Sequence, residues 1–110
     1  MHQGLRFRVM LTMDVVPGME KQFEAVWRDG ADVIGSHPAS LAHTLSRSTG
    51  HDNRYYIVSD WSDEESFRAF EGSDAHLTHR ARLHPFRSSG SFDMMWVLGQ
   101  TTEDGEGTAR

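Results

Sequence analysis

The stretch 55–70, YYIVSDWSDEESFRAF, narrows the possible folds more than any other, because it predicts a strand that runs directly into a helix. Side chains alternate along a strand, so one face of this one carries Tyr55, Ile57, Ser59 and Trp61. Ser62, with Glu65 three residues later, has the spacing of a capping box and predicts where the helix begins. Phe67 and Phe70 follow at helical spacing, so this helix is expected to turn an aromatic face back to the sheet.

Alternating apolar residues predict three further strands, over residues 6–15, 41–47 and 91–98. In the first of them one face carries Phe7, Val9, Leu11 and Met13. In the last, one face carries Phe92, Met94, Trp96 and Leu98. Residues 87–90, Arg-Ser-Ser-Gly, are interpreted as a loop that leads into this last strand.

A first helix is predicted between Pro17-Gly18 and Gly35-Ser36. Its apolar residues recur at steps of three and four and form one stripe: Met19, Phe23, Val26, Trp27, Val33 and Ile34. The second helix is expected to be interrupted at residues 72–74 and to restart with Ser73 or Asp74 as its cap.

The predicted order is strand, helix, strand, strand, helix, strand. With right-handed crossovers it gives an α+β, ferredoxin-like βαββαβ fold, in which a four-stranded antiparallel sheet carries both helices on one face. We assign residues 1–100 to this single domain and residues 101–110 to a disordered acidic tail. The other face of the sheet would expose Met10, Tyr56, Val58, Met95 and Val97. Since soluble monomers rarely expose such a patch, we expect a homodimer formed sheet to sheet.

Composition excludes several classes of protein. A chain of 110 residues with 37% hydrophobic content fits one domain, and the absence of cysteine rules out disulfides and zinc–thiolate sites. The net charge of −5, with scattered arginines, argues against nucleic acid as a partner. No apolar run approaches the roughly 20 residues of a membrane span. The first residues do not resemble a signal peptide either, so we expect a soluble, cytoplasmic protein.

A small-molecule pocket is expected between sheet and helices, where aromatic residues of the third strand meet His43, Arg47 and His79. For Trp61, Phe67 and Phe70 the alternative is ordinary core packing. His43 and Arg47 share a strand face with two leucines, so they need partners inside the protein or contact with water. If that face looks towards the helices, the two are a proton donor and a clamp for an anion or carbonyl. If that strand face instead forms part of a dimer interface, His43 and Arg47 have a structural role.

Other site chemistries find little support in the sequence. His76, His79 and His84 suggest a metal site, but there is no HExxH motif and no matching carboxylate on the facing strand, so we expect no metal. Arginines 80, 82 and 87 are expected to pair with glutamates 64, 65 and 71 at the surface. The absence of GxGxxG and GxSxG motifs disfavours nucleotide, flavin and serine-hydrolase functions.

The run from the strand through Trp61, the acidic first turn, Phe67, Phe70 and the SDAH of residues 73–76 resembles the antibiotic biosynthesis monooxygenase superfamily of dimeric α+β barrels. The resemblance spans about residues 6–99. The segments YYIVSDW, SDAH and LHPFRSSGS are similar to those of small proteins of aromatic polyketide pathways in actinobacteria, which act as anthrone oxygenases or late-ring cyclases. The resemblance implies a pocket between sheet and helices in each subunit.

The same resemblance favours one of these two chemistries. Cofactor-free anthrone oxygenases of the family combine the tryptophan with an asparagine, a tyrosine and a histidine, at positions that hold Ile57, Phe67 and Arg47 here. Haem-degrading members need an asparagine on the first strand, and residues 6–15 contain none. The prediction is therefore an aromatic polyketide cyclase without a cofactor, since an aldol closure needs only a folded substrate, an enol and loss of water.

In this prediction the catalytic residues are His43, Arg47, Trp61 and His79, with a histidine moving the proton and Arg47 or Arg87 polarising a carbonyl. The expected contacts to a small aromatic polyketide are Tyr55, Ile57, Phe67, His76, Arg87, Met94 and Trp96. Two alternatives remain open: a cofactor-independent monooxygenase acting on an anthrone or phenolic polyketide, and a non-catalytic protein that binds polyketide intermediates.

Overall fold

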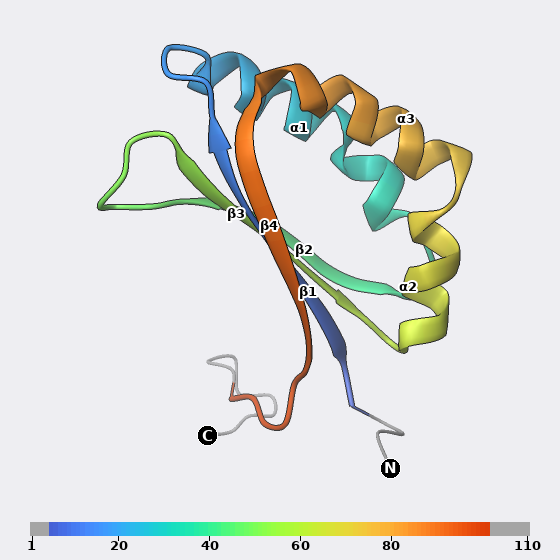
Figure 1. The fold of residues 1–110 in the computed structure, drawn as a ribbon. Helices are drawn as coiled ribbons and strands as arrows, with labels where there is room; N and C mark the ends of the chain where they lie inside the picture. The colour runs from blue at the N-terminus through green and yellow to red at the C-terminus, as the bar shows by residue number, and fades with distance from the viewer. Residues whose placement is uncertain (1–4, 102–110) are drawn as a thin grey trace.

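Within residues 5–101, which the computed structural model describes, one antiparallel sheet in the order β2-β3-β1-β4 carries its helices on a single face (Figure 1). The elements are β1 (Phe7–Val15), α1 (Glu20–Gly35), β2 (Ser40–Arg47), β3 (Arg54–Trp61), α2 (Glu64–Glu71), α3 (Asp74–Leu83), the 3₁₀ turn η1 (His84–Phe86) and β4 (Arg87–Trp96). The predicted α+β, ferredoxin-like fold is confirmed. Apart from Thr101, the predicted disordered tail lies outside the described residues.

Helix α1 begins after a turn in which Gly18 takes a φ of 92°, a conformation that glycine adopts without a steric penalty. Its buried residues are Phe23, Trp27, Gly30 and Ile34, at steps of four, three and four. Val33, which the sequence placed in the apolar stripe, is 38% exposed, because it lies one residue to the side of the face that meets the sheet.

The start of α2 differs from the prediction by one residue. Asp63, not Ser62, caps the helix, and its carboxylate accepts a hydrogen bond from the backbone N–H of Ser66 at 2.7 Å. Ser62 lies between β3 and α2, and its N–H donates to the carbonyl of Ala39, just before β2, at 3.0 Å. The predicted interruption of the second helix is confirmed, and the Ser73 hydroxyl caps α3 by accepting from the N–H of His76.

Strand β4 begins four residues earlier than predicted. Residues 87–90, interpreted as a loop, pair with β1, so that Arg87 lies opposite Val15 and Gly90 opposite Met13. Backbone hydrogen bonds to β1 hold this segment in the sheet. Its serines and glycine do not alternate with apolar residues, so the sequence pattern did not predict a strand here. The strand also ends earlier, at Trp96.

The core lies between sheet and helices in two clusters. The first contains Phe7, Val9, Ile34, Trp61, Phe67 and Phe70. The second contains Met13, Val15, Phe23, Trp27, Tyr55 and Leu83. The strand registers place the first cluster at the α2 end of the sheet and the second at the opposite end, so the middle of the layer is left for other residues.

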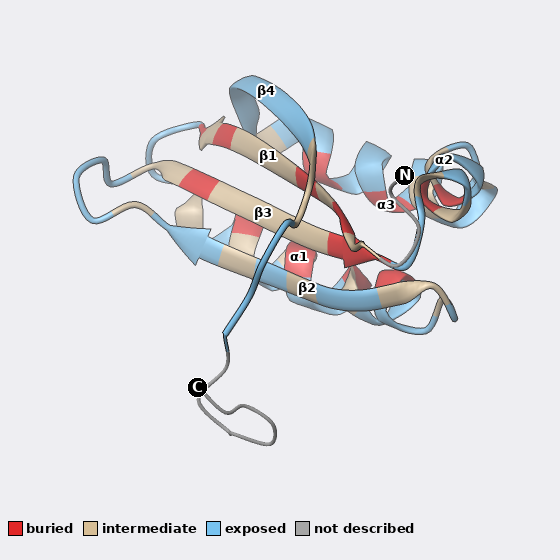
Figure 2. Cartoon of the chain, turned by 90° about the horizontal axis from the view of Figure 1, so that it is seen from below, coloured by how far each residue is buried: buried red, intermediate tan, exposed pale blue. Residues whose placement is uncertain are grey.

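On the face of the sheet without helices, seen in Figure 2, the central strands β1 and β3 are mostly of intermediate exposure, and the edge strands β2 and β4 are mostly exposed. Its most buried polar group is Asp60, 3% exposed, which accepts hydrogen bonds from Arg8 at 2.7 and 2.8 Å and from Arg6 at 3.1 Å. The apolar residues expected on this face are half-buried: Met10, Tyr56, Val58, Met95 and Val97. The homodimer stays a prediction. Among residues 5–101, no helix has the length and apolar character needed to cross a bilayer.

Candidate functional site

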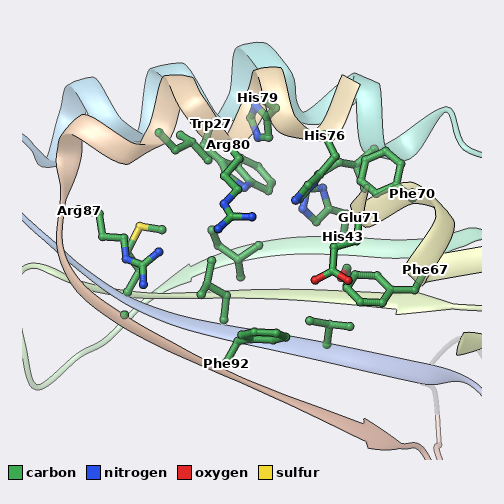
Figure 3. Close-up of a pocket in the computed structure, with 18 of the residues that line it drawn as sticks. Trp27, His43, Phe67, Phe70, Glu71, His76, His79, Arg80, Arg87 and Phe92 are labelled. Atoms are coloured by element: carbon green, nitrogen blue, oxygen red, sulfur yellow. The ribbon is translucent and has the colours of Figure 1, made fainter. Parts of the chain in front are cut away.

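A cavity of about 360 Å³ lies between the sheet and the helices (Figure 3). This volume is in the roughly 300–1,000 Å³ range typical of small-molecule sites. Its floor is apolar and comes from the helix-facing side chains of β1 and β3, including Val9, Leu11 and Ile57. Helices α1, α2 and α3 form the roof and walls, and Phe92 of edge strand β4, 47% exposed, lines the remaining side.

Trp61 forms part of the cavity wall and is also fully packed into the first core cluster. Its ring centroid lies 5.6 Å from that of Phe67 and 5.2 Å from that of Phe70. The indole N–H donates to the hydroxyl of Ser59 at 3.0 Å. Trp61 therefore packs in the core and also lines the cavity, and its one polar group is already engaged.

His43 stands on β2 opposite Ser59 and lines the cavity, with its ring 4.8 Å from that of Trp27. Its Nδ1 atom is buried and makes no hydrogen bond. Burial, with a smaller contribution from the nearby His79, lowers the pKa of His43 to about 4. At neutral pH this imidazole is uncharged and has a free nitrogen with which to accept a proton.

Two more histidines enter the cavity from α3. His79 is 5% exposed, and neither of its ring nitrogens makes a hydrogen bond. Burial lowers its pKa, and the charges of His76 and Arg82 act in the same direction. The pKa of His76 is lowered by burial and by Arg80, while Glu71 opposes the shift. The cavity thus holds three imidazoles, all biased towards the neutral form.

The position of His79 depends on a glycine in the facing helix. A Cβ atom at Gly30 of α1 would lie 2.0 Å from Nδ1 and 2.3 Å from Cε1 of the His79 ring. Only a residue without a side chain leaves room for the ring there, so α1 and α3 approach closely at this point.

The prediction that Arg80, Arg82 and Arg87 pair with glutamates of α2 is wrong. Arg68 is the residue that pairs with Glu64 and Glu71, since these residues are four and three positions away on the same helix. Arg82 pairs instead with Asp29 of α1, at 2.9 Å. Arg80 and Arg87 line the cavity. Within residues 5–101 no cluster of three or more histidine, aspartate or glutamate side chains is arranged to hold a metal ion.

Comparison with known proteins identifies the group to which this fold and cavity belong. Residues 6–82 match the family described as Antibiotic biosynthesis monooxygenase. The chain belongs to this family.

The chain is similar to several bacterial proteins. The chain is 27% identical to protein SchA of Streptomyces halstedii over 105 residues, which is 94% of this chain and 27% of SchA. It is 30% identical to the 42.8 kDa protein in the whiE locus of Streptomyces coelicolor over 74 residues, 67% of this chain and 19% of that protein. The chain thus spans only about a quarter or less of these two relatives. SnoaB, a cofactor-independent oxygenase from Streptomyces nogalater, has the same fold, with a TM-score of 0.79 at 22% identity, covering 90% of this chain and 99% of SnoaB.

In this family member, the cavity brings together seven of the residues that the sequence singled out: His43, Ile57, Trp61, Phe67, His76, His79 and Arg87. Four others lie elsewhere. Arg47 is at the end of β2, with its side chain 55% exposed and 3.8 Å from Glu24. Tyr55 is buried in the second cluster and its hydroxyl donates to Glu24 at 2.5 Å. Trp96 packs on Phe7, and Met94 does not line the cavity.

Sequence reasoning also left out residues that line the cavity, among them Trp27, Ser59, Glu71, Arg80 and Phe92. Signals for two of them were available. Ser59 alternates with Trp61 along β3, and Arg80 follows His76 by four residues on one face of α3. Trp27 and Phe92 are apolar residues in predicted elements, and such residues line a core as often as a site.

Proposed function

We propose that this protein is an aromatic polyketide cyclase, which binds a planar intermediate in the cavity and catalyses an aldol-type ring closure with loss of water. The observation that carries the proposal is the set of three imidazoles, those of His43, His76 and His79, which have buried ring nitrogens without hydrogen bonds inside an apolar, aromatic cavity. Burial lowers the pKa of each. Family membership and the resemblance of several segments to small proteins of aromatic polyketide pathways support the substrate class.

The walls of the cavity suit a substrate with rings already formed. Trp27, Phe67 and Phe92 line it together with Trp61, so a flat ring system has aromatic surfaces to stack on. Holding the open part of the chain against the closed part replaces a search over many conformations by one reactive arrangement. This positioning is the main contribution of the cavity.

His43 supplies the proton transfer. Its neutral imidazole removes a proton from a carbon between two carbonyl groups, and the resulting enolate carbon forms a bond to a ketone carbon of the same chain. The imidazolium returns the proton to the new alkoxide. His43 or the neighbouring His79 then removes a second carbon proton, the C–O bond breaks as the C=C bond forms, and the imidazolium gives its proton to the departing hydroxyl group, which leaves as water.

The low pKa of His43 belongs to the empty cavity, where an imidazolium would be buried without a counter-charge. An enolate that forms beside the ring provides that charge, and the attraction between the two is strong in an apolar surrounding. The pKa of His43 therefore rises as the reaction begins, which is the direction a general base needs.

A second candidate is a cofactor-independent monooxygenase, which the family description and the shared fold with SnoaB favour. It begins with the same proton abstraction by His43, after which the carbanion reacts with molecular oxygen instead of a carbonyl. The two candidates differ in their need for oxygen and in the mass of the product.

The test uses purified protein and an intermediate whose first rings are closed, made in place by a ketosynthase pair with its acyl carrier protein and an early-ring cyclase. Products are analysed by liquid chromatography and mass spectrometry. We expect His43→Ala to lose the cyclised product and release shunt polyketides. His51→Ala, which changes an exposed histidine in the β2–β3 turn, should behave as the unchanged protein.

Three outcomes decide between the candidates. Cyclised product formed equally without oxygen supports the cyclase. Oxygen uptake that requires the protein, with ¹⁸O in the product, replaces it with the monooxygenase. Product control that survives both His43→Ala and His79→Ala refutes catalysis by these histidines and leaves a non-catalytic binding protein.

A further inference from the structure

Two arginines line the cavity without any counter-charge. Within residues 5–101, seven arginines make ion pairs: Arg6, Arg8, Arg28, Arg47, Arg54, Arg68 and Arg82. In that part of the chain, the guanidinium groups of Arg80 and Arg87 make neither an ion pair nor a hydrogen bond, and both residues line the cavity. Figure 3 shows the guanidinium of Arg80 projecting from α3 and that of Arg87 beside β4, both pointing into the cavity.

The backbone of β4 shapes the place that Arg87 occupies. A Cβ atom at Gly90 would lie 2.7 Å from Nε, 2.8 Å from Nη2 and 2.9 Å from Cζ of Arg87. The guanidinium therefore folds back along its own strand over the bare Cα of Gly90, which also lines the cavity. Any larger residue at position 90 would push the charge away from this position.

The other charged or titratable groups of the cavity do not neutralise the arginines. Glu71 lines it on the α2 side, next to Phe67 in Figure 3, and its carboxylate is 3.4 Å from Arg68. His43, His76 and His79 are biased towards the neutral form, and His84, which also lines the cavity, can only add positive charge.

The uncompensated positive charge of Arg80 and Arg87 affects which ligand the cavity prefers. Both arginines are exposed, so water can solvate their guanidinium groups, and an aromatic ligand bound in the cavity displaces part of that water. Charged groups that lose water without gaining a partner are strongly unfavourable, so a ligand with an anionic group at this place is preferred. Arginine presents its donors in a planar fork that matches a carboxylate or phosphate with two parallel hydrogen bonds.

We propose that Arg80 and Arg87 bind a carboxylate of the polyketide, and that the substrate is therefore a free acid and not a chain still attached to its carrier. This inference rests on the proposed function. A chain held as a carrier thioester has no terminal carboxylate, so the reaction that supplies this substrate is hydrolysis of that thioester. The carrier's phosphopantetheine phosphate is the other source of an oxyanion. It is separated from the thioester by a long flexible arm, whereas both arginines lie in the cavity wall itself.

The experiment compares matched probes by equilibrium titration, following the fluorescence of Trp27 and Trp61, which line the cavity. The probes are anthraquinone-2-carboxylate, its neutral carboxamide and its thioester with 4′-phosphopantetheine. We expect the carboxylate to bind roughly 10- to 100-fold more tightly than the carboxamide, the range of a hydrogen bond to a charged group. Arg80→Gln and Arg87→Gln should each reduce this preference, and the double variant should abolish it.

Arg82→Gln is the matched control, because Arg82 lies on the same helix but pairs with Asp29 outside the cavity, and it should keep the preference. Circular dichroism and urea unfolding verify that each variant is folded. Equal binding of carboxylate and carboxamide, or a preference that survives in the double variant, would overturn the proposal. Tightest binding of the phosphopantetheine thioester would overturn the free-acid substrate in favour of a carrier-bound one.

The result of this binding experiment can be distinguished from the result of the cyclase test. Binding of the probes needs no turnover, so His43→Ala should keep the carboxylate preference even where it abolishes the cyclised product. A product profile unchanged in His43→Ala would refute the cyclase mechanism and leave the anion site standing.

Discussion

Gly30→Ala tests whether the close approach of α1 and α3 places His79. The new Cβ atom would lie 2.0 Å from Nδ1 of a ring that is 5% exposed, so the ring or the helix must move. Such overpacking destabilises by about 1–3 kcal/mol. Alanine in place of glycine inside a helix contributes about 1 kcal/mol in the other direction. Because the overlap is severe, we expect a net loss of about 1–2 kcal/mol in the free energy of unfolding.

The control lies on the same helix. A Cβ atom at Gly35 meets no atom within 4 Å, so Gly35→Ala should be neutral or stabilising. Urea unfolding at one fixed protein concentration measures both, since the stability of a protein that associates depends on its concentration. In a His79→Ala background the overlap disappears, and Gly30→Ala should become stabilising by up to about 1 kcal/mol.

This change of sign is the decisive result. If Gly30→Ala raises the urea midpoint in the unchanged protein as Gly35→Ala does, or has the same effect with and without the His79 ring, the glycine does not position the histidine. The explanation given for the position of His79 would then be wrong.

Two further predictions concern charge and pH. Asp60→Asn removes the carboxylate held by Arg6 and Arg8, and should lower the free energy of unfolding by about 1–3 kcal/mol, whereas Arg28→Gln, at an exposed pair, should change it by at most about 1 kcal/mol. Urea midpoints check both, and equal effects would contradict the burial argument. Burial lowers the pKa of His43 from 6.5 to about 4 in the folded protein. Between pH 6.5 and pH 4 the unfolded chain therefore binds a proton at this residue that the folded protein does not bind. His43 thus leaves stability intact above pH 6.5 and reduces it as the pH falls towards 4, and His43→Phe should flatten that part of the curve; NMR titration of His43 with a midpoint near 6.5 would contradict it.

The arrangement of the sheet could be predicted because strand faces repeat every two residues. The alternation of Phe7, Val9, Leu11 and Met13 placed one face of β1 correctly, and that of residues 55–61 did the same for β3. Boundaries were less secure. Ser62 and Asp63 are both good cap residues, and only the hydrogen bond from Ser62 N–H to Ala39, 23 positions earlier in the chain, places the cap at Asp63.

The candidate site was predicted in part, and the errors have a common origin. His43 and Arg47 lie on the same face of β2, but His43 is covered by helices and Arg47 reaches the solvent at the end of the strand. The alternation of side chains shows on which face of a strand a residue lies. It does not show how far along that strand the helices cover the face. Arg80 was assigned to a surface pair for a similar reason, because a helical face does not reveal which carboxylates other elements bring near.

The amino-acid sequence by itself determined the order of the elements, the faces of the strands and the aromatic character of the layer between sheet and helices. These follow from local periodicity, which each segment carries independently of the rest. Only the tertiary structure decided where that layer stays open, which histidines are buried and so have a lowered pKa, and which arginine side chains are left without a partner. Those properties depend on the volumes and charges of side chains far apart in the chain, and these meet only when the sheet and the three helices have packed together.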